Sequence, residues 1–347
     1  MMKTSRMLSK RERTLLKHIV ESYIRNALPV GSRYLAKAYN LGISPATIRN
    51  VMNDLEEMGY LKQPHVSAGR IPTDKGYRFY VDCLTSTNAF GEHDRQLILA
   101  NFSDLSIDVE EILEVSSRVL GEISSQLGVV LEPSFYNGIF NKMELVSISD
   151  TRILAVITIE SGLVKTIMME IQTEVSRDQL HETSRIINER LSGLSLKEVK
   201  DTLDKRLADT GISNPMLLRT IIRFADKLFS FQKQKDLHVG GTMNIMSNPE
   251  FSDHVHVSKI IELIDRKENI LHFLNATQTD NLTVRIGREN EGELFSEYSV
   301  ISARYRLGRV AGTLGVVGPT RMHYSRIIPL VSFMGDVLTR KLCSVWC

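Results

Sequence analysis

The spacing of apolar residues predicts two helices at the start of the chain. Residues 9–26 carry an apolar stripe at helical spacing, and Ser9 with Glu12 forms the S-x-x-E pattern of a capping box. A proline and a glycine then break the pattern. Residues 32–40 follow as a second, shorter helix, for which Ser32 is the expected N-cap.

A third helix is predicted after the tight turn at residues 40–42. Ser44 is the expected N-cap, Pro45 occupies the first helical position, and Gly59 ends the helix in a left-handed conformation. The apolar face consists of Ile48, Val51, Met52, Leu55 and Met58. The open face carries Ala46, Arg49, Asn50 and Asn53. One buried face and one uncluttered polar face are typical of a recognition helix.

The next segment predicts a small hairpin. Tyr60 and Leu61 begin an extended stretch, HVSAG forms the turn, and Arg70 with Ile71 forms the return strand. A further helix, capped by Thr73, then leaves the domain. Three helices followed by such a hairpin indicate a winged helix-turn-helix.

The distribution of charge indicates the class of partner. The whole chain has a formal net charge of +2, but residues 1–80 contain 14 Lys and Arg against 6 Asp and Glu. The rest of the chain contains 29 basic and 35 acidic residues. A basic first domain on an acidic remainder favours binding of that domain to a polyanion such as DNA.

Nine residues of the basic domain are candidates for contact with double-stranded DNA. In the major groove arginine can pair with guanine and asparagine with adenine, while Ala46 gives the helix clearance. The helix N-terminus at Ser44 can hold a phosphate, and Arg70 at the wing can reach phosphates or the adjacent minor groove. The candidates are Ser44, Ala46, Thr47, Arg49, Asn50, Asn53, Arg70, Arg33 and Lys37. Sequence-independent attraction is expected from Lys10, Arg11, Arg13, Lys17, Arg33 and Lys37.

The remainder of the chain predicts an α+β arrangement. The expected elements are a linker at 86–93, a helix at 109–127, strands at 143–150, 151–160 and 164–171, further strands at 281–287, 297–307 and 309–318, and a final helix at 320–342. Because strands occur at both ends with helices between them, we expect one sheet domain interrupted by an insertion.

The insertion, 173–275, is predicted to be mostly helical. Ser195 and Glu198 form a second capping box, and residues 214–231 form one strongly apolar helix. Such a wide apolar helix suits either a core or an interface, and the pattern does not separate the two.

Other motifs give little support to catalysis or cofactor binding. The glycines of 308–318 lack the helix and the Lys-Ser/Thr of a phosphate-binding loop, so strand glycines beside a close packing partner are expected. His254 and His256 lack further metal ligands nearby, as does CSVWC at 343–347. We therefore expect no enzyme, metal or cofactor. The longest apolar runs are far shorter than a membrane span, which favours a cytoplasmic protein.

The segment that begins at Ser44 resembles the winged-helix head of the HrcA family of bacterial heat-inducible transcription repressors. Its sequence is SPATIRNVMNDLEEMGYLKQPHVSAGRIPTDKGYRFYVD. VGGTMNIMSNPEF at 239–251 and VVGPTRMHYSRIIPLV at 316–331 extend the resemblance over nearly the whole chain. The resemblance implies repression of chaperone operons through binding of the CIRCE inverted-repeat operator, with activity maintained by the GroEL chaperonin.

The resemblance also implies a domain organisation. A winged helix-turn-helix DNA-binding domain is expected at 1–85, a GAF-like α/β sheet domain at 94–172 and 276–347, and an inserted dimerisation domain at 173–275. A homodimer is expected chiefly because an inverted repeat requires a protein with two-fold symmetry.

Two other functions stay open at this point. The first is a metabolite-responsive winged-helix transcription regulator with a small effector in the GAF-like domain, which a ligand-induced rise in melting temperature would reveal. The second is an enzyme that uses the second half of the chain for catalysis. It would need clustered titratable side chains in one pocket, and the sequence does not show such a set.

Overall fold

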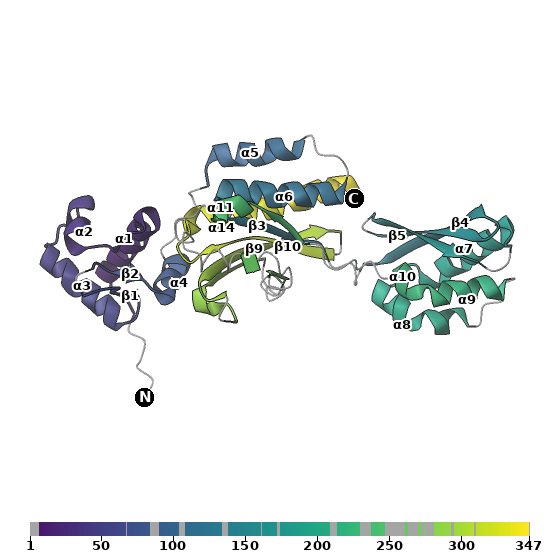
Figure 1. Cartoon of the computed structure of the whole chain (residues 1–347), viewed down its shortest axis with the longest axis horizontal. Helices are drawn as coiled ribbons and strands as arrows, with labels where there is room; N and C mark the ends of the chain where they lie inside the picture. Colours follow the sequence, from purple (N-terminus) through teal and green to yellow (C-terminus); the bar gives the residue numbers. More distant parts are fainter. Residues whose placement is uncertain are drawn as a thin grey trace, which may run out of the picture.

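The computed structural model describes most of the chain. The described residues are 7–66, 68–83, 90–103, 108–133, 138–160, 162–171, 174–208, 214–229, 237–246, 261–262, 270–271, 274, 281–292, 295–308 and 310–346. They form three lobes that follow one another along the longest axis of the molecule (Figure 1). We call described residues 7–83 the head, those of 90–133 and 237–346 the central domain, and those of 138–229 the outer lobe. The predicted α+β fold class with an N-terminal winged helix is confirmed.

The head is a winged helix. Its elements are α1 (Lys10–Asn26), α2 (Ser32–Ala38), α3 (Pro45–Glu57), β1 (Leu61–Lys62), β2 (Ile71–Pro72) and α4 (Asp74–Cys83). The capping box of Ser9 and Glu12 opens α1, as predicted. Thr73 caps α4, because its Oγ1 accepts a 3.2 Å hydrogen bond from the backbone N–H of Gly76. β1 and β2 pair antiparallel and form the wing.

The expected N-cap of α2 is wrong by one residue. Gly31 is the N-cap and makes no side-chain hydrogen bond, while Ser32 is the first helical residue and is buried. The reason is a β-bridge between Val30 and Arg70, in which each backbone N–H donates to the other residue's carbonyl at 2.9 Å. Because this bridge keeps the chain extended at Val30, the helix starts only after Gly31.

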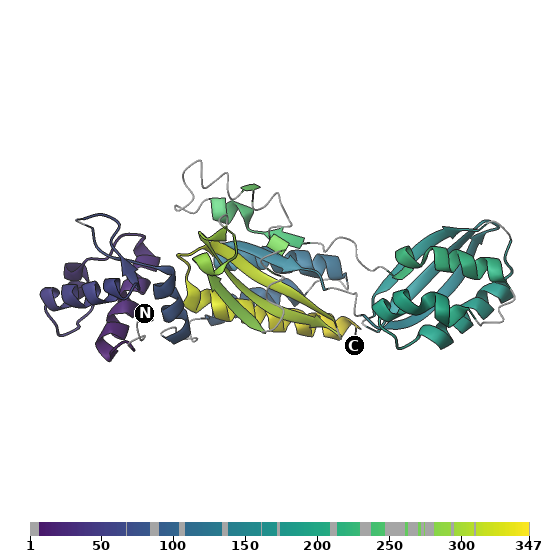
Figure 2. The ribbon, with the colours of Figure 1, turned by 90° about the horizontal axis from the view of Figure 1, so that it is seen from below.

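The central domain is built on an antiparallel sheet in the order β7-β3-β10-β9-β8. Its elements are α5 (Glu92–Ser103), α6 (Val109–Ser124), β3 (Leu127–Leu131), β7 (Leu237–Gly240), α11 (Thr242–Met246), β8 (Leu282–Ile286), a 3-10 turn (Gly287–Glu289), β9 (Tyr298–Leu307), β10 (Val310–Pro319) and α14 (Tyr324–Trp346). α6 and α14 cover one face of the sheet, and α5 packs against both of them (Figures 1 and 2).

Strand glycines are confirmed at Gly312, Gly315 and Gly318, which lie within β10, whereas Gly308 follows the end of β9 with a left-handed φ of 59°. A Cβ at Gly312 would lie 2.3 Å from the ring of Tyr305. That ring is fully buried, and its hydroxyl donates a 2.8 Å hydrogen bond to the carbonyl of Leu131. Close approach of β10 to this ring therefore requires glycine at position 312.

The helix predicted over 109–127 is three residues too long. Ser125 adopts a left-handed conformation with φ of 54°, which ends α6 at Ser124, and Leu127 begins β3. Every residue of β3 is buried, so the strand lacks the alternation that marks a half-exposed strand, and it was not predicted. α5 was not predicted either, and its first residues lie in the segment expected to be a linker.

The outer lobe combines a second antiparallel sheet, in the order β4-β5-β6, with helices. Its elements are β4 (Phe140–Ser149), β5 (Arg152–Ile159), β6 (Val164–Glu170), α7 (Arg177–Leu191), α8 (Leu196–Leu207), α9 (Pro215–Arg223) and α10 (Ala225–Phe229). The helix predicted over 214–231 is divided, because Phe224, with φ of −90° and ψ of 2°, separates α9 from α10.

The predicted single sheet formed by 94–172 and 276–347 is wrong. β4, β5 and β6 form a sheet of their own, whereas β8, β9 and β10 pair with β3 and β7. Short turns join β4 to β5 and β5 to β6, and such turns favour pairing between neighbours in sequence. The chain leaves the central sheet after β3 and returns in β7, so the insertion contains three strands as well as the helices.

Side chains of α7 protect the outer edge of β4. The Asn188 amide accepts a 2.7 Å hydrogen bond from the backbone N–H of Met143 and donates one of 3.0 Å to its carbonyl. Ser184 Oγ accepts a 3.2 Å hydrogen bond from the backbone N–H of Leu145. An edge strand satisfied in this way offers less of its backbone to another chain.

Helix α4 fastens the head to the central domain. Arg78 forms an ion pair with Glu289 and donates a 2.6 Å hydrogen bond to the carbonyl of Val284. The hydrogen bond with Glu289 raises the pKa of Arg78 further above its ordinary value. Beside this pair the ring of Tyr77 packs against Tyr324, with centroids 5.8 Å apart. These contacts hold the head in one orientation on the edge of the central sheet.

Replacing Arg78 by alanine should loosen the head. The loss of hydrogen bonds to a carboxylate and a carbonyl is expected to reduce the local stability of α4 by about 1–2 kcal/mol, which hydrogen exchange at its amides measures. Arg118→Ala is the control, because Arg118 is exposed and pairs only with Glu122 on its own helix among the described residues. Equal exchange rates at α4 in the two variants would contradict the role of Arg78.

Candidate nucleic-acid interface

Helix α3 is seated in the head by one apolar face. Ile48 and Leu55 are fully buried, and Val51 and Met52 are nearly so. Ser44 Oγ caps the helix by accepting a 3.2 Å hydrogen bond from the backbone N–H of Thr47, as predicted. The opposite face, with Ala46, Arg49, Asn50 and Asn53, is exposed. Burial of one face therefore leaves the other free to enter a groove.

A hollow of about 630 Å³ lies between the start of α2, the middle of α3 and the wing. It is lined by Gly31, Ser32, Arg33, Arg49, Met52, Asn53, Gln63, Val66, Ala68, Gly69 and Arg70. Four of the predicted DNA-binding residues thus meet in one place, namely Arg33, Arg49, Asn53 and Arg70. The other five, Ser44, Ala46, Thr47, Asn50 and Lys37, do not line this hollow.

The residues outside the hollow have different surroundings. Ser44 and Thr47 hydrogen-bond to each other through their hydroxyls at 3.0 Å, at the N-terminus of α3. Asn50 is exposed on α3, and Lys37 is exposed in the last turn of α2. Backbone N–H groups at the start of α3 make this end suitable for a phosphate.

Arg70 is placed differently from the expectation. Its side chain is only 15% exposed, and its Nε lies 2.7 Å from Glu56 Oε2. Its Nη2 donates a 3.0 Å hydrogen bond to Asn53 Oδ1. The guanidinium therefore turns back onto α3, whereas the sequence suggested that it extends from the wing toward phosphates.

Glu56 is a residue of the interface that the sequence did not suggest. Besides the ion pair with Arg70, its Oε1 accepts a 3.1 Å hydrogen bond from the backbone N–H of Gln63. The Gln63 side chain donates to the carbonyls of Val66 and Ala68, at 2.8 Å and 3.1 Å, across the turn of the wing. Glu56 thus joins the wing to α3. No signal in the sequence singles out Glu56, since Asp54 and Glu57 lie beside it at the end of α3.

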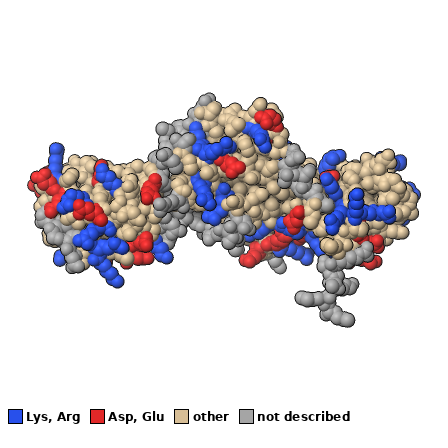
Figure 3. Space-filling view, turned by 180° about the vertical axis from the view of Figure 1, so that it is seen from behind, with Lys and Arg blue, Asp and Glu red and all other residues tan. Residues whose placement is uncertain are grey.

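Three exposed cations of α2 and α3 have no ion-pair partner among the described residues. Arg33, Lys37 and Arg49 are exposed, and within the described ranges no carboxylate lies within 4 Å of them. Figure 3 shows Lys and Arg side chains spread over the head, which lies at the right of that view. Unpaired surface cations attract a polyanion over a distance set by the ionic strength.

His18 is partly buried between two helices of the head. The ring of His18 stacks on Tyr39 with centroids 4.0 Å apart, where α1 meets the end of α2. Burial lowers the pKa of His18 below its ordinary value, against the opposing effect of Glu21. A neutral His18 is thus favoured where the two helices pack.

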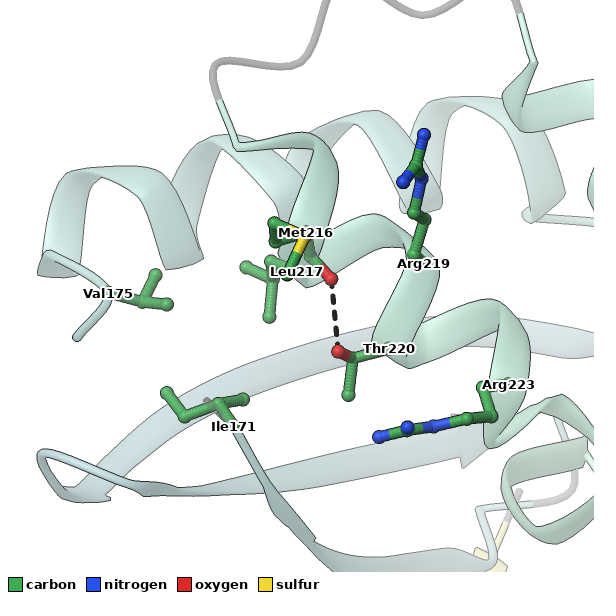
Figure 4. Close-up of a pocket in the computed structure, with 7 residues that line it drawn as sticks. All are labelled: Ile171, Val175, Met216, Leu217, Arg219, Thr220 and Arg223. Carbon is green, nitrogen blue, oxygen red and sulfur yellow. Dashed lines mark hydrogen bonds between the residues drawn. The ribbon is translucent and has the colours of Figure 1, made fainter. Parts of the chain in front are cut away.

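A second pocket, in the outer lobe, has a volume of about 230 Å³ (Figure 4). It lies between α9 and the ends of β6 and α7, and it is lined by Ile171, Val175, Met216, Leu217, Arg219, Thr220 and Arg223. The Thr220 hydroxyl is occupied, since it donates a 3.0 Å hydrogen bond to the carbonyl of Met216. Arg219 points away from the apolar lining, whereas Arg223 points across it. The lining carries no pair of acid and base groups for catalysis.

Neither metal binding nor membrane insertion finds support among the described residues. Within the described ranges, no three His, Cys, Asp or Glu residues come together as metal ligands. His254, His256 and Cys347 lie outside the described residues. Among the helices that the structure describes, none has the length and apolar character needed to cross a membrane.

Comparison with known proteins supports the reading of the head and extends it to the whole chain. Residues 7–82 match the family described as "Winged helix-turn-helix transcription repressor, HrcA DNA-binding", and residues 110–328 match "HrcA protein C terminal domain". A crystal structure of a hypothetical protein at 2.2 Å resolution has a TM-score of 0.62 and 25% identity, and the match covers 98% of this chain and 100% of that one.

Two curated relatives are similar over almost their full length, and both are named heat-inducible transcription repressor HrcA. The protein from Chlorobium phaeobacteroides (strain BS1) is 41% identical, over 96% of this chain and 98% of its own. The protein from Chlorobaculum parvum is 42% identical, over 97% of this chain and 98% of its own. With a winged helix whose recognition face is open, and with both family matches in place, the chain belongs to the HrcA family of heat-inducible transcription repressors.

Proposed function

We propose that the chain binds the CIRCE inverted-repeat operator as a homodimer, represses chaperone operons, and depends on the GroEL chaperonin for its active form. The observation that carries this proposal is the exposed face of α3 beside a hollow lined by the exposed cations Arg33 and Arg49. The relatives' name favours heat, and not a metabolite, as the signal.

Each head takes one half-site. Arg49, Asn50 and Asn53 on the open face of α3 reach base edges in the major groove. Arg33 and Lys37 on α2 contact phosphates and fix the register. Because the two heads are related by a two-fold axis, the half-sites lie on one side of the duplex, separated by whole helical turns.

The dimer contact is assigned to the outer lobe. One face of its sheet carries apolar side chains that solvent reaches, and four of them are 44–54% exposed: Val146, Ile148, Val164 and Met168. In the strand register Val146 lies opposite Leu154, and Leu154 lies opposite Met168, so each strand contributes to one apolar row. A second copy of this chain is the occupant that the inverted repeat requires, and a self-complementary apolar face suits it.

Binding to DNA should be selective and should depend on exposed cations of the head. The fluorescence anisotropy of a labelled CIRCE-type duplex is measured while protein is added, at each concentration of a salt series. The affinity obtained is compared with the affinity for a scrambled duplex. Arg49→Ala is expected to reduce the selectivity, which is the difference in binding free energy between the two duplexes, by about 1–3 kcal/mol. Lys37→Ala is expected to lower the salt slope, which is the slope of log affinity against log salt concentration, by about one per head. Lys37→Ala should leave the selectivity unchanged. Arg118→Ala, remote on α6, is the control. Equal binding of the wild-type protein to both duplexes would contradict sequence reading by the head.

Met168→Glu should weaken the dimer. A carboxylate on the apolar row would have to be buried without a partner, so the dissociation constant of the dimer is expected to rise by more than about tenfold, as measured by sedimentation. Ala208→Glu adds the same charge at an exposed position after α8 and should leave the dimer intact. An unchanged dissociation constant for the Met168→Glu dimer would exclude this sheet face as the dimer interface.

The chaperonin should raise the fraction of active repressor. A stoichiometric titration with operator DNA counts active dimers before and after incubation with GroEL and ATP, following a heat pulse. The expected result is a larger active fraction at an unchanged affinity, because refolding changes the number of competent molecules and leaves their contacts unaltered. An unchanged active fraction would count against chaperonin dependence.

A further inference from the structure

The root of the wing is clamped to α3 at Arg70. The backbone of Arg70 is bonded to Val30 in both directions at 2.9 Å. A Cβ on the preceding residue, Gly69, would lie 2.4 Å from the carbonyl oxygen of Val30, so the two segments touch closely at this point. The Arg70 side chain, 15% exposed, then extends along α3 to Glu56 and Asn53. Both ends of this residue are therefore fixed.

The chemistry of guanidinium decides how the Asn53 amide is oriented. Arginine carries only donors, so the atom that it meets must be the carbonyl Oδ1 of Asn53, at 3.0 Å from Nη2. The amide nitrogen of Asn53 then points away from Arg70. A carbonyl oxygen has two lone pairs, so Oδ1 can accept from Arg70 and from a base at once. The exposed amide thus presents a donor and an acceptor in a fixed order.

We propose that Arg70 is a positioning residue for Asn53, and that Asn53 reads the N6 and N7 edge of an adenine in each half-site. The inference rests on the proposed function, in which this face of α3 enters the major groove. Adenine is the base whose major-groove edge combines an acceptor with a neighbouring donor, as a bidentate asparagine requires. Glu56 holds Arg70 in place from the other side.

A phosphate contact by Arg70 fits the structure less well. To reach a phosphate, the guanidinium would leave Glu56, and the carboxylate would then face the DNA backbone without its cation. Arg33 lines the same hollow, is exposed, and supplies a cation without such a cost. Arg70, which is mostly buried and paired with Glu56, and Arg33, which is exposed, therefore have different roles.

The test uses the full-length protein, with selectivity and salt slope measured separately. The variants are Asn53→Ala, Arg70→Met, which keeps the aliphatic stem, and the double variant, with Arg33→Ala as the matched arginine control. Asn53→Ala and Arg70→Met should each reduce selectivity by about tenfold, and the double variant by no more than either. Arg70→Met should keep the wild-type salt slope, whereas Arg33→Ala should lower it by about one per head.

A second readout addresses the base directly. Replacement of single half-site adenines by 7-deazaadenine removes the N7 acceptor. At one adenine position per half-site, this replacement should lower the affinity of the wild-type protein by about tenfold. The same replacement should leave the affinities of Arg70→Met and Asn53→Ala unchanged. If Arg70→Met has a lower melting temperature than the wild-type protein, Glu56→Gln is used in its place, because loss of the carboxylate releases Arg70. The affinity of Glu56→Gln should then also be insensitive to 7-deazaadenine.

Two results would overturn the role of Arg70. One is a salt slope in Arg70→Met that falls as in Arg33→Ala, which makes Arg70 a phosphate ligand. The other is a loss of affinity for the 7-deazaadenine duplex that persists in Arg70→Met or, if that variant has a lower melting temperature, in Glu56→Gln. Failure of the wild-type protein to discriminate operator from scrambled DNA, even after chaperonin treatment, is a different result, because it would overturn the proposed function itself.

Discussion

The burial of one face of α3 is the constraint on which the head depends. An isolated helix of 13 residues is marginal in water, so tertiary packing must hold it. The fully buried side chains of Ile48 and Leu55 each contribute about 1.5–3 kcal/mol. Because these residues lie on one side only, the packing that stabilises α3 also determines which residues face solvent. The wing is then fastened to this seated helix through Glu56.

Local signals allowed the head to be predicted almost residue by residue. Ser44 caps α3, Pro45 stands at its first position, and Gly59 ends it with φ of 78°, as the sequence indicated. Each of these features depends on neighbours within a few positions. The N-cap of α2 was misplaced because a bridge to Arg70, forty residues away, sets where the helix can begin. The position of the Arg70 side chain escaped prediction for a similar reason, since its partners lie on α3.

The division of the sheets could not be read from the strand pattern. β4–β6 and β8–β10 show ordinary strand patterns, and nothing in them states which strands share a sheet. The central sheet depends on β3 and β7, which flank the outer lobe in sequence and pair with each other. β3 is entirely apolar and short, and it follows α6 directly, so its residues continued the helical stripe. The GAF-like character and the dimer interface stay predictions.

The arrangement of the three lobes separates the candidate recognition helix from the sheet face proposed for the dimer contact. The head and the outer lobe lie at opposite ends of the molecule, with the central domain between them (Figure 1). If the outer lobe makes the proposed dimer contact, a signal from that contact to the DNA crosses the central sheet and the contacts of α4. The ion pair of Arg78 and Glu289 joins the head to the central domain on this path. A change in their pairing would alter the orientation of the head and leave the recognition helix itself intact.

The most direct test of DNA recognition by α3 locates this helix on the operator. A DNA-cleaving iron chelate is attached through Asp54→Cys, an exposed position of α3 outside the proposed base contacts, in a protein whose native cysteines are replaced by serine. A chelate at position 205 of α8 serves as the control. If α3 enters the major groove of each half-site, cleavage is centred on that groove in both half-sites and is symmetric about the inverted repeat, and the control chelate cleaves neither. Cleavage confined to one half-site, spread evenly along the duplex, or equal from the two positions would contradict this placement of α3.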